Sequence, residues 1–158
     1  MSTSPPDTGL RLQRPNLVVA DLDRALRFYR DILGFTVEFH KDSEPDSYSY
    51  PVFEIPGKAK LRFCVLSANE AQPRSLALTE ITGIELAAMP LPRRNALVLN
   101  ITDIDGVLTA ARAEGLNVYR EERLETNDGR TGREIGIVDH DGHLAVSYTH
   151  LRAHETGV

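Results

Sequence analysis

The sequence predicts an α+β fold built from two copies of one module, because the chain repeats itself. LVVADLDRALRFYRDILGFTV (residues 17–37) is echoed by LNITDIDGVLTAARAEGLNV (residues 99–118). Each copy has an apolar run, an Asp-hydrophobic-Asp cap, an amphipathic helix, a glycine and a second apolar run. Asp21 and Asp23 correspond to Asp103 and Asp105 at an offset of 82 residues (103 − 21). Neither copy is large enough to bury a core alone, so we expect one domain over residues 1–158.

The first module begins with a strand over residues 14–19. Asp21 is expected to cap the following helix, because its carboxylate can accept from the free amides of the first turn. The helix has one apolar face at three- and four-residue steps, and Gly34 ends it: Ala25, Leu26, Tyr29, Ile32 and Leu33. Further strands are predicted over residues 35–39, 50–55, 61–66 and 75–81, between proline and glycine breakers.

The second module repeats this order. Residues 96–101 are predicted as a strand, residues 103–114 as a helix, and residues 117–121 and 133–139 as strands, with a last strand opening at His143. Asn-Asp-Gly at residues 127–129 and Asp-Gly at residues 141–142 supply turns. The paired prolines of MPLPRRN (residues 89–95) break both kinds of element. We therefore place module one at about residues 12–88 and module two at about 95–148.

Composition excludes several classes of protein. The 158 residues are 41% hydrophobic and 26% charged, as in a soluble globular domain. A net charge of −5 without a basic stripe argues against a nucleic-acid partner. The single cysteine, Cys64, excludes a disulfide framework and is typical of a reducing cytoplasm. No apolar stretch could span a bilayer, and residues 1–9 lack the features of a signal peptide, so no membrane partner is expected.

The last residues have an unusual sequence. VSYTHLRAHET, residues 146–156, equals one reading frame of a transposase sequencing adapter. We therefore expect the native sequence to stop near Leu144 and residues 146–158 to be an artefactual tail, which belongs outside fold and site reasoning. The alternative is an ordinary C-terminal strand and tail.

RPNLVVADLDRALRFYRDILGFTV (residues 14–37), with the later ALVLNITDID and VDHDGHL, resembles the vicinal oxygen chelate superfamily. That superfamily comprises glyoxalases, extradiol ring-cleaving dioxygenases, fosfomycin-type resistance enzymes and bleomycin resistance proteins. The resemblance covers about residues 12–144. It implies two βαβββ modules whose sheets form a partly open, eight-stranded mixed β-barrel with a cavity between them. Fold does not decide function here, because the superfamily holds metal enzymes and metal-free binding proteins.

The resemblance also implies where metal ligands would lie. The four positions are Arg14, Ala77 (with Leu78 as the alternative register), Ala96 and Val146, where the family often has His, Glu or Gln, His and Glu. A guanidinium or a hydrocarbon side chain cannot donate an electron pair to a divalent metal. We therefore predict no metal site and no cofactor. His140 and His143 flank an Asp-Gly turn, and we interpret them as solvated turn residues.

Strand alternation suggests the residues that line the cavity. It turns Arg14 and Asn16 of the first strand inward, with Asn100 of the fifth, and it directs Arg62 and Cys64 the same way. Arginine suits an anionic or carbonyl-bearing ligand, because its rigid fork of donors matches a carboxylate or phosphate. The alternative is that the arginines end in solvent or pair with acids such as Glu54 and Glu80. Cys64 is most simply a small core residue.

Residues 43–57 form a longer connection that carries three aromatic rings, including that of Tyr48. Rings with one polar end suit a lid over the cavity, where Tyr48 would contact a ligand, or the contact of a homodimer. The alternative is an extra edge strand that packs on its own module.

Two functions follow from these observations. The first is metal-independent binding of a small organic molecule in the inter-module cavity, as in bleomycin resistance proteins. The second is a lyase or dioxygenase in which a divalent metal polarises vicinal oxygens of a substrate. The sequence identifies no catalytic residue and does not decide whether the protein is an enzyme.

Overall fold

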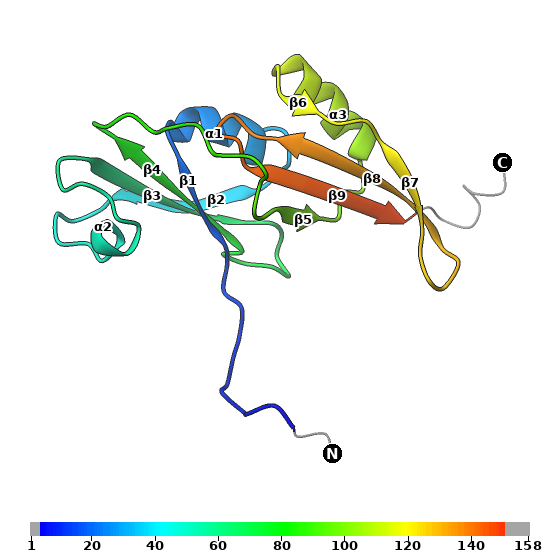
Figure 1. The fold of residues 1–158 in the computed structure, drawn as a ribbon, viewed down its shortest axis with the longest axis horizontal. Coiled ribbons are helices and arrows are strands. Elements are labelled where there is room, and N and C mark those ends of the chain that lie inside the picture. The colour runs from blue at the N-terminus through cyan, green and yellow to red at the C-terminus, as the bar shows by residue number, and fades with distance from the viewer. Residues whose placement is uncertain (1–3, 151–158) are drawn as a thin grey trace.

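The computed structural model describes residues 4–150, which contain three helices and nine strands. The strands form two mixed sheets, of four and five strands. In Figure 1 the sheets lie side by side, α1 and α3 lie on the same side of them, and the segment before β1 extends away from the body. Residues 1–3 and 151–158, which include most of the predicted artefactual tail, lie outside the described range. None of the described helices is long and apolar enough to cross a membrane.

The first sheet has the strand order β1-β4-β3-β2. β1 runs parallel to β4, and the other pairs are antiparallel. Helix α1 (Leu22–Tyr29) connects β1 to β2. The bounds are β1 (Asn16–Val19), β2 (Thr36–Asp42), β3 (Lys60–Ser67) and β4 (Leu76–Thr82).

The second sheet has the order β5-β9-β8-β6, with β7 also paired to β8. Its parallel pair is β5 with β9, and α3 (Ile104–Ala113) follows β5. The sheet therefore traces the same path as the first. The bounds are β5 (Leu97–Leu99), β6 (Asn117–Val118), β7 (Glu122–Glu125), β8 (Thr131–Val138) and β9 (Leu144–His150).

The expected barrel of eight strands is not found in this form. Within residues 4–150 no ladder joins the two sheets, so the strands do not close into a barrel. The ninth strand arises because β6 and β7 lie end to end along β8. Val118 pairs with Ile137 and Glu122 with Glu134, so three residues on one side (119–121) lie opposite two on the other (135–136). The predicted strand over residues 117–121 is therefore shortened to β6, and β7 is a strand that the sequence analysis did not predict.

Helix α1 begins as its sequence predicts. Asp21 is its N-cap, and the carboxylate of Asp21 accepts a hydrogen bond from Arg24 N at 3.0 Å. The helix ends at Tyr29, before the predicted end, because the next amides donate further back: Leu33 N bonds to Phe28 O at 2.8 Å. Gly34 follows with φ of 93°, in the left-handed region that glycine adopts at low cost.

Helix α3 repeats the capping of α1. The carboxylate of Asp103 accepts from Gly106 N at 3.1 Å, and the helix begins at the next residue, Ile104. The two Asp-hydrophobic-Asp motifs therefore act as local start signals in both halves of the chain.

The prediction of a strand over residues 50–55 is wrong. The segment contains the short helix α2 (Ser49–Val52), in which Phe53 N donates to Ser49 O at 3.0 Å. Pro51 explains the difference, because a residue without an N–H cannot donate in a strand ladder but is tolerated in the first turn of a helix.

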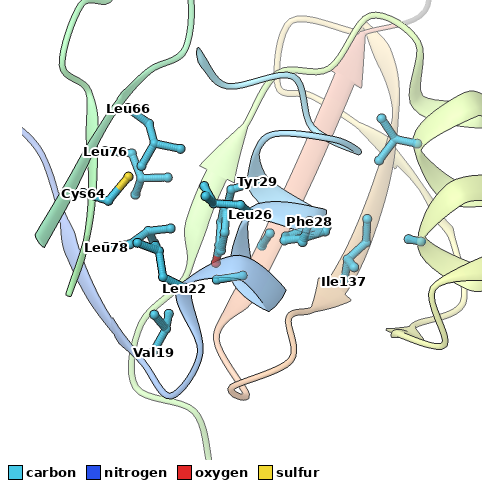
Figure 2. Close-up of a cluster of buried hydrophobic side chains, with 14 of the residues drawn as sticks. Val19, Leu22, Leu26, Phe28, Tyr29, Cys64, Leu66, Leu76, Leu78 and Ile137 are labelled. Carbon is cyan, nitrogen blue, oxygen red and sulfur yellow. The ribbon is translucent and has the colours of Figure 1, made fainter. Parts of the chain in front are cut away.

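One hydrophobic core cluster joins both halves of the chain. Figure 2 shows Cys64, Leu66, Leu76 and Leu78 of the first sheet facing α1, and Phe28 pointing toward Ile137 of the second sheet. Phe28 and Tyr29 are 0% and 1% exposed, although both lie on one short helix. Helix α1 thus lies in the core that the two sheets share.

The β8–β9 turn adds polar contacts between the two halves. Asp139 is buried and accepts from the hydroxyl of Tyr29 at 2.7 Å. Asp141 Oδ1 accepts from Ala20 N at 2.8 Å, and His143 Nε2 donates to Val18 O at 2.7 Å. The prediction of solvated turn residues is wrong for both histidines. The side chain of His140 is 12% exposed and its Nε2 lies 3.1 Å from Glu114 Oε1. His143 is partly buried and fixes this turn against the end of β1.

Candidate functional site

A groove between the two halves of the chain is the candidate site. It consists of two adjoining hollows of about 480 and 580 Å³, which share the stretch around Val98 and Leu99 of β5. The opposite wall comes from the β3–β4 hairpin and from Phe35, and residues 11–15 before β1 line the first hollow. The first hollow is mostly apolar, whereas the second has more polar than apolar surface. The polar side chains of the groove are Arg11, Gln13, Arg14, Asn69, Gln72, Ser75 and Asn100.

The site lies beside an edge strand of each sheet. β1 and β5 are the terminal strands of their sheets in the described part of the chain, each paired on one side only. The side chain of Val98 is 74% exposed at this edge. A concave, largely apolar surface with some polar groups is typical of a binding site for a small organic molecule, and the first hollow has this character.

Among the predicted site residues, Arg14 lines the groove directly. It is partly buried, lines the first hollow, and donates from Nη1 to Arg74 O at 3.4 Å. None of the ion pairs within residues 4–150 involves Arg14. A guanidinium has five N–H donors in a plane, so most of its donors remain available to an anionic or carbonyl group.

The two predicted asparagines lie differently. Asn100 is exposed and lines the second hollow, next to the one that contains Arg14. Asn16 does not line the groove, and its Oδ1 accepts from the hydroxyl of Thr79 at 2.8 Å. Thr79 is 2% exposed, so this bond satisfies a buried hydroxyl between β1 and β4.

Arg62 lies near the start of β3, away from the groove, which meets the other end of this strand at Ala68. Its Nη2 pairs with Glu80 Oε2 at 3.2 Å, and the same oxygen accepts from Leu22 N at 2.6 Å, at the start of α1. Arg62 therefore does not line the groove, and it pairs with Glu80 as the alternative interpretation expected. Cys64 also lies on the α1 side, within the core, and burial raises the pKa of its thiol.

Alternation did not identify the residues of β3 near the groove, because this strand is buried on both faces. Leu66 packs against α1, whereas Leu61 packs in a second cluster with Ile55, Ala59 and Ile81. A strand with two buried faces has no polar face, so its pattern does not show which side meets a cavity.

Tyr48 lies outside the groove, and its side chain is 77% exposed. Its neighbour Tyr50 packs against the second cluster and donates its hydroxyl to Ala59 O at 2.8 Å. Part of the 43–57 connection thus covers its own sheet, as the alternative interpretation expected, although as a helical turn rather than a strand.

The sequence interpretation missed the β3–β4 hairpin as part of the site. Ala68, Ala71 and Gln72 line both hollows, and Pro73 and Ser75 line the first. The available signal was the polar stretch SANEAQPRS between two apolar strands, which indicates a hairpin connection. Nothing in that stretch indicates that it meets β5, because the contact depends on the packing of the two halves.

The four positions at which the resemblance implies metal ligands do not fit a divalent cation. Ala77 pairs with Asn16 and Val146 with Val98, while Ala96 directly precedes β5. With Arg14, the set offers three hydrocarbon side chains and one cation, and none of these is an electron-pair donor at ordinary pH. In the part of the chain that the structure describes, no group of three or more His, Cys, Asp or Glu could hold a metal ion.

The end of β9 bears on the adapter-like segment. Ala145 to Ser147 pair with β5, and Ser147 is buried. Up to His150 this segment therefore continues the last strand, as the alternative of an ordinary C-terminal strand expected. The origin of these residues stays a prediction.

Comparisons with known proteins give the same fold over nearly the whole chain. A glyoxalase family protein from Bacillus cereus superposes with a TM-score of 0.71, covering 96% of this chain and 99% of that chain at 18% identity. For the trypanothione-dependent glyoxalase I of Leishmania major the TM-score is 0.61, covering 89% and 86% at 21% identity. For the fosfomycin resistance protein FosX of Mesorhizobium loti it is 0.53, covering 94% and 98% at 16% identity.

Identities this low show a shared fold and say nothing about activity. No curated protein matches the sequence. The family comparison is more decisive. Residues 11–146 match the sequence model of the Glyoxalase/Bleomycin resistance protein/Dioxygenase superfamily. The chain therefore belongs to the glyoxalase/bleomycin resistance protein/dioxygenase superfamily.

Proposed function

We propose that this protein binds a small organic molecule with an anionic or carbonyl group in the groove between its two halves, without a metal ion. The observation that carries the proposal is the position of Arg14, a cation with no carboxylate partner in the described chain, in a hollow whose other walls are mostly apolar. An apolar body would pack against Phe35, Leu76 and Leu97, and the anionic group would meet the guanidinium.

Two dyes of similar shape test the role of charge. 8-Anilinonaphthalene-1-sulfonate carries a sulfonate, whereas N-phenyl-1-naphthylamine is its uncharged counterpart. We expect Arg14→Leu to weaken binding of the sulfonate about tenfold, the equivalent of ~1.4 kcal/mol, and to leave the uncharged dye unchanged. Fluorescence titration measures both affinities. Arg94→Leu is the matched control, because Arg94 is exposed and lies outside the groove.

Equal affinity of wild type and Arg14→Leu for the sulfonate would refute anion recognition by Arg14. Loss of both dyes together would assign the effect to packing rather than charge, which would also count against the proposal. Competition by a series of small carboxylates then ranks candidate ligands by their displacement of the bound dye.

Metal content separates this proposal from the metal-dependent lyase or dioxygenase. The support for metal independence is the donor set, in which Arg14, Ala77, Ala96 and Val146 offer no ligand atoms. Emission spectroscopy on protein purified without added ions should give well below one equivalent of Fe, Mn, Ni or Zn. About one equivalent of any of these would overturn metal independence while leaving the groove as the binding site.

We also propose that the protein forms a homodimer. Its support is the free edge of β5, where Val98 is 74% exposed, and the exposed leucines before β1, Leu10 and Leu12, at 90% and 85%. Exposed apolar surface of this kind is common at protein interfaces. Light scattering during size-exclusion chromatography measures the mass directly, and a single-chain mass at high concentration would refute the dimer.

A further inference from the structure

The β3–β4 hairpin is held at both of its ends by serine hydroxyls. Ser67 Oγ accepts from Arg74 N at 2.8 Å, and Ser75 Oγ accepts from Ala68 N at 3.0 Å. The hydroxyl of Ser67 also donates to Glu38 Oε1 at 2.6 Å and is part of a residue that is 5% exposed. The two ends of the hairpin are therefore fixed to each other and to β2.

The tip of the hairpin is also ordered by its own hydrogen bonds. Gln72 N donates to Asn69 O at 3.1 Å, and Ala71 N donates to Asn69 Oδ1 at 2.9 Å. This part of the hairpin forms the wall of the groove opposite β5. A wall fixed in this way presents its groups to a ligand with little ordering cost on binding.

Arg74 has an unusual backbone in this hairpin. Its φ is 52°, in the left-handed region that side-chain-bearing residues other than Asn and Asp rarely adopt. The surrounding contacts must offset the cost of that conformation, and such strained residues are often found at functional sites. The consequence visible in the structure is the direction of one carbonyl, because Arg74 O accepts from Arg14 Nη1 at 3.4 Å.

The side chain of Arg74 lies elsewhere. Its guanidinium carbon is 5.9 Å from the ring centre of Phe39, and Arg74 does not line the groove. The backbone of Arg74 and its side chain therefore meet different parts of the molecule. Substitutions can separate the two contributions.

We propose that the β3–β4 hairpin positions Arg14 for ligand binding through the carbonyl of Arg74, with Ser67 holding Arg74 in its left-handed conformation. Arg74 and Ser67 are thus positioning residues, and Arg14 is the group that meets the ligand. The proposal rests on the function proposed above. The long hydrogen bond from Arg14 Nη1 to Arg74 O engages one edge of the guanidinium. It leaves the other N–H groups free and limits the directions in which they can point.

Three substitutions of Arg74 test the role of its backbone. Arg74→Gly and Arg74→Asn remove the guanidinium but tolerate positive φ, whereas Arg74→Val removes the guanidinium and strongly disfavours positive φ. We expect Gly and Asn to bind 8-anilinonaphthalene-1-sulfonate within about twofold of wild type, and Val to bind it about three- to tenfold more weakly. Ser67→Ala should resemble Arg74→Val, because it removes the acceptor for Arg74 N.

The uncharged N-phenyl-1-naphthylamine distinguishes positioning from loss of structure. If Arg74→Val or Ser67→Ala weakens both dyes equally, the hairpin acts only as a wall of the groove and the positioning proposal is wrong. If all three Arg74 variants weaken the sulfonate equally, the side chain rather than the backbone is responsible, which also overturns it.

The result for Arg14→Leu separates this inference from the proposed function. If Arg14→Leu leaves the sulfonate affinity unchanged, the proposed function has failed and no positioning of Arg14 matters for it. If Arg14→Leu weakens the sulfonate but Arg74→Val and Ser67→Ala do not, the function stands and the positioning proposal fails. Both proposals are supported if Arg14→Leu, Arg74→Val and Ser67→Ala each weaken binding of the charged dye while Arg74→Asn binds it nearly as well as wild type.

Discussion

At the scale of single residues, the buried carboxylate of Asp139 shows how polar groups connect the two halves. Asp139 Oδ2 accepts from the hydroxyl of Tyr29, and Oδ1 accepts from the backbone amides of Asp141 and His143, at 2.9 and 2.8 Å. Burial and the neighbouring carboxylate of Asp139 raise the pKa of Tyr29, so its hydroxyl stays a donor at all ordinary pH values. The bond requires the protonated hydroxyl, which Tyr29 therefore keeps at ordinary pH.

Tyr29→Phe is expected to lower the free energy of unfolding by about 1–3 kcal/mol, because it leaves a buried carboxylate oxygen without its side-chain donor. Urea denaturation measures the change. Tyr48→Phe is the matched control, since the ring of Tyr48 is 77% exposed and should change stability by less than about 0.5 kcal/mol. Equal effects of the two substitutions would contradict a structural role for the Tyr29 hydroxyl.

The sequence could place Arg14 better than Arg62 for a physical reason. Arg14 lies in the segment directly before β1, which lines the groove, whereas Arg62 belongs to β3, which is buried on both faces. Tyr48 could not be placed because its position depends on a helical turn that apolar periodicity did not indicate. Arg74 had no sequence signal, because its left-handed backbone follows from the contacts around it.

At the scale of elements, helix starts were predictable and helix ends were less so. The caps Asp21 and Asp103 act through amides three residues away, which makes them readable from local sequence. The end of α1 depends on hydrogen bonds after Tyr29 that reach five residues back instead of four, and on packing against the sheets. The prediction therefore succeeded where the cause was local.

Gly34→Ala tests the conformation after α1. An alanine at φ of 93° is strained, so we expect a loss of about 1–2 kcal/mol in the free energy of unfolding. Gly57→Ala is the matched control, because Gly57 does not have positive φ and an added Cβ there meets nothing within 4 Å. Thermal or urea unfolding of both variants gives the comparison, and a neutral Gly34→Ala would show that this turn can relax.

The turn between β7 and β8 gives a pH-dependent prediction. Hydrogen bonds from the hydroxyl of Thr126 and from Arg130 lower the pKa of Asp128 to about 2, from an ordinary value of 3.8. Because the folded pKa is depressed, the stabilising contribution of Asp128 is present above pH 3.8 and is lost as the pH falls toward 2.

Carboxyl carbon NMR titration checks this directly. The midpoint for Asp128 should lie near pH 2 in the wild type and should rise toward 3.8 in Thr126→Val, which removes the largest cause of the shift. A wild-type midpoint near 3.8 would show that the turn does not hold these bonds in solution.

At the scale of the whole molecule, the core belongs to both halves. Phe28 is fully buried and packs in the cluster that contains Leu76 and Leu78 of the first sheet and Ile135 and Ile137 of the second. Outside that cluster, Arg27 of α1 pairs with Glu114 after α3 at 2.6 Å. The two halves should therefore unfold together.

Phe28→Ala is expected to lower the free energy of unfolding by about 3–5 kcal/mol, through lost burial and the cavity left behind. Hydrogen exchange should then accelerate in β3 and in β8 by the same factor, because one cooperative unit includes both. Phe53→Ala makes the same change at a side chain that is 37% exposed and should cost far less. Acceleration confined to β3 would show that the halves unfold separately.

The repeat in the sequence predicted much of this architecture, namely an α+β fold with strands around two capped helices. It could not predict that the sheets stay separate, because closure of a barrel depends on contacts between β1, β5 and other distant strands. The groove could not be predicted from the sequence for the same reason, because Phe35, Gln72 and Val98 come together only when the two halves pack.

The separation of the two sheets has a practical consequence for the linker. Every described ladder joins strands from the same side of residues 83–95, so cutting the peptide bond between Met89 and Pro90 would sever no sheet. Each fragment would keep its full set of strands and one capped helix, with half of an apolar interior exposed. Co-expressed fragments should therefore reassemble through that interior, which would make this chain a candidate split reporter whose signal depends on the two pieces meeting.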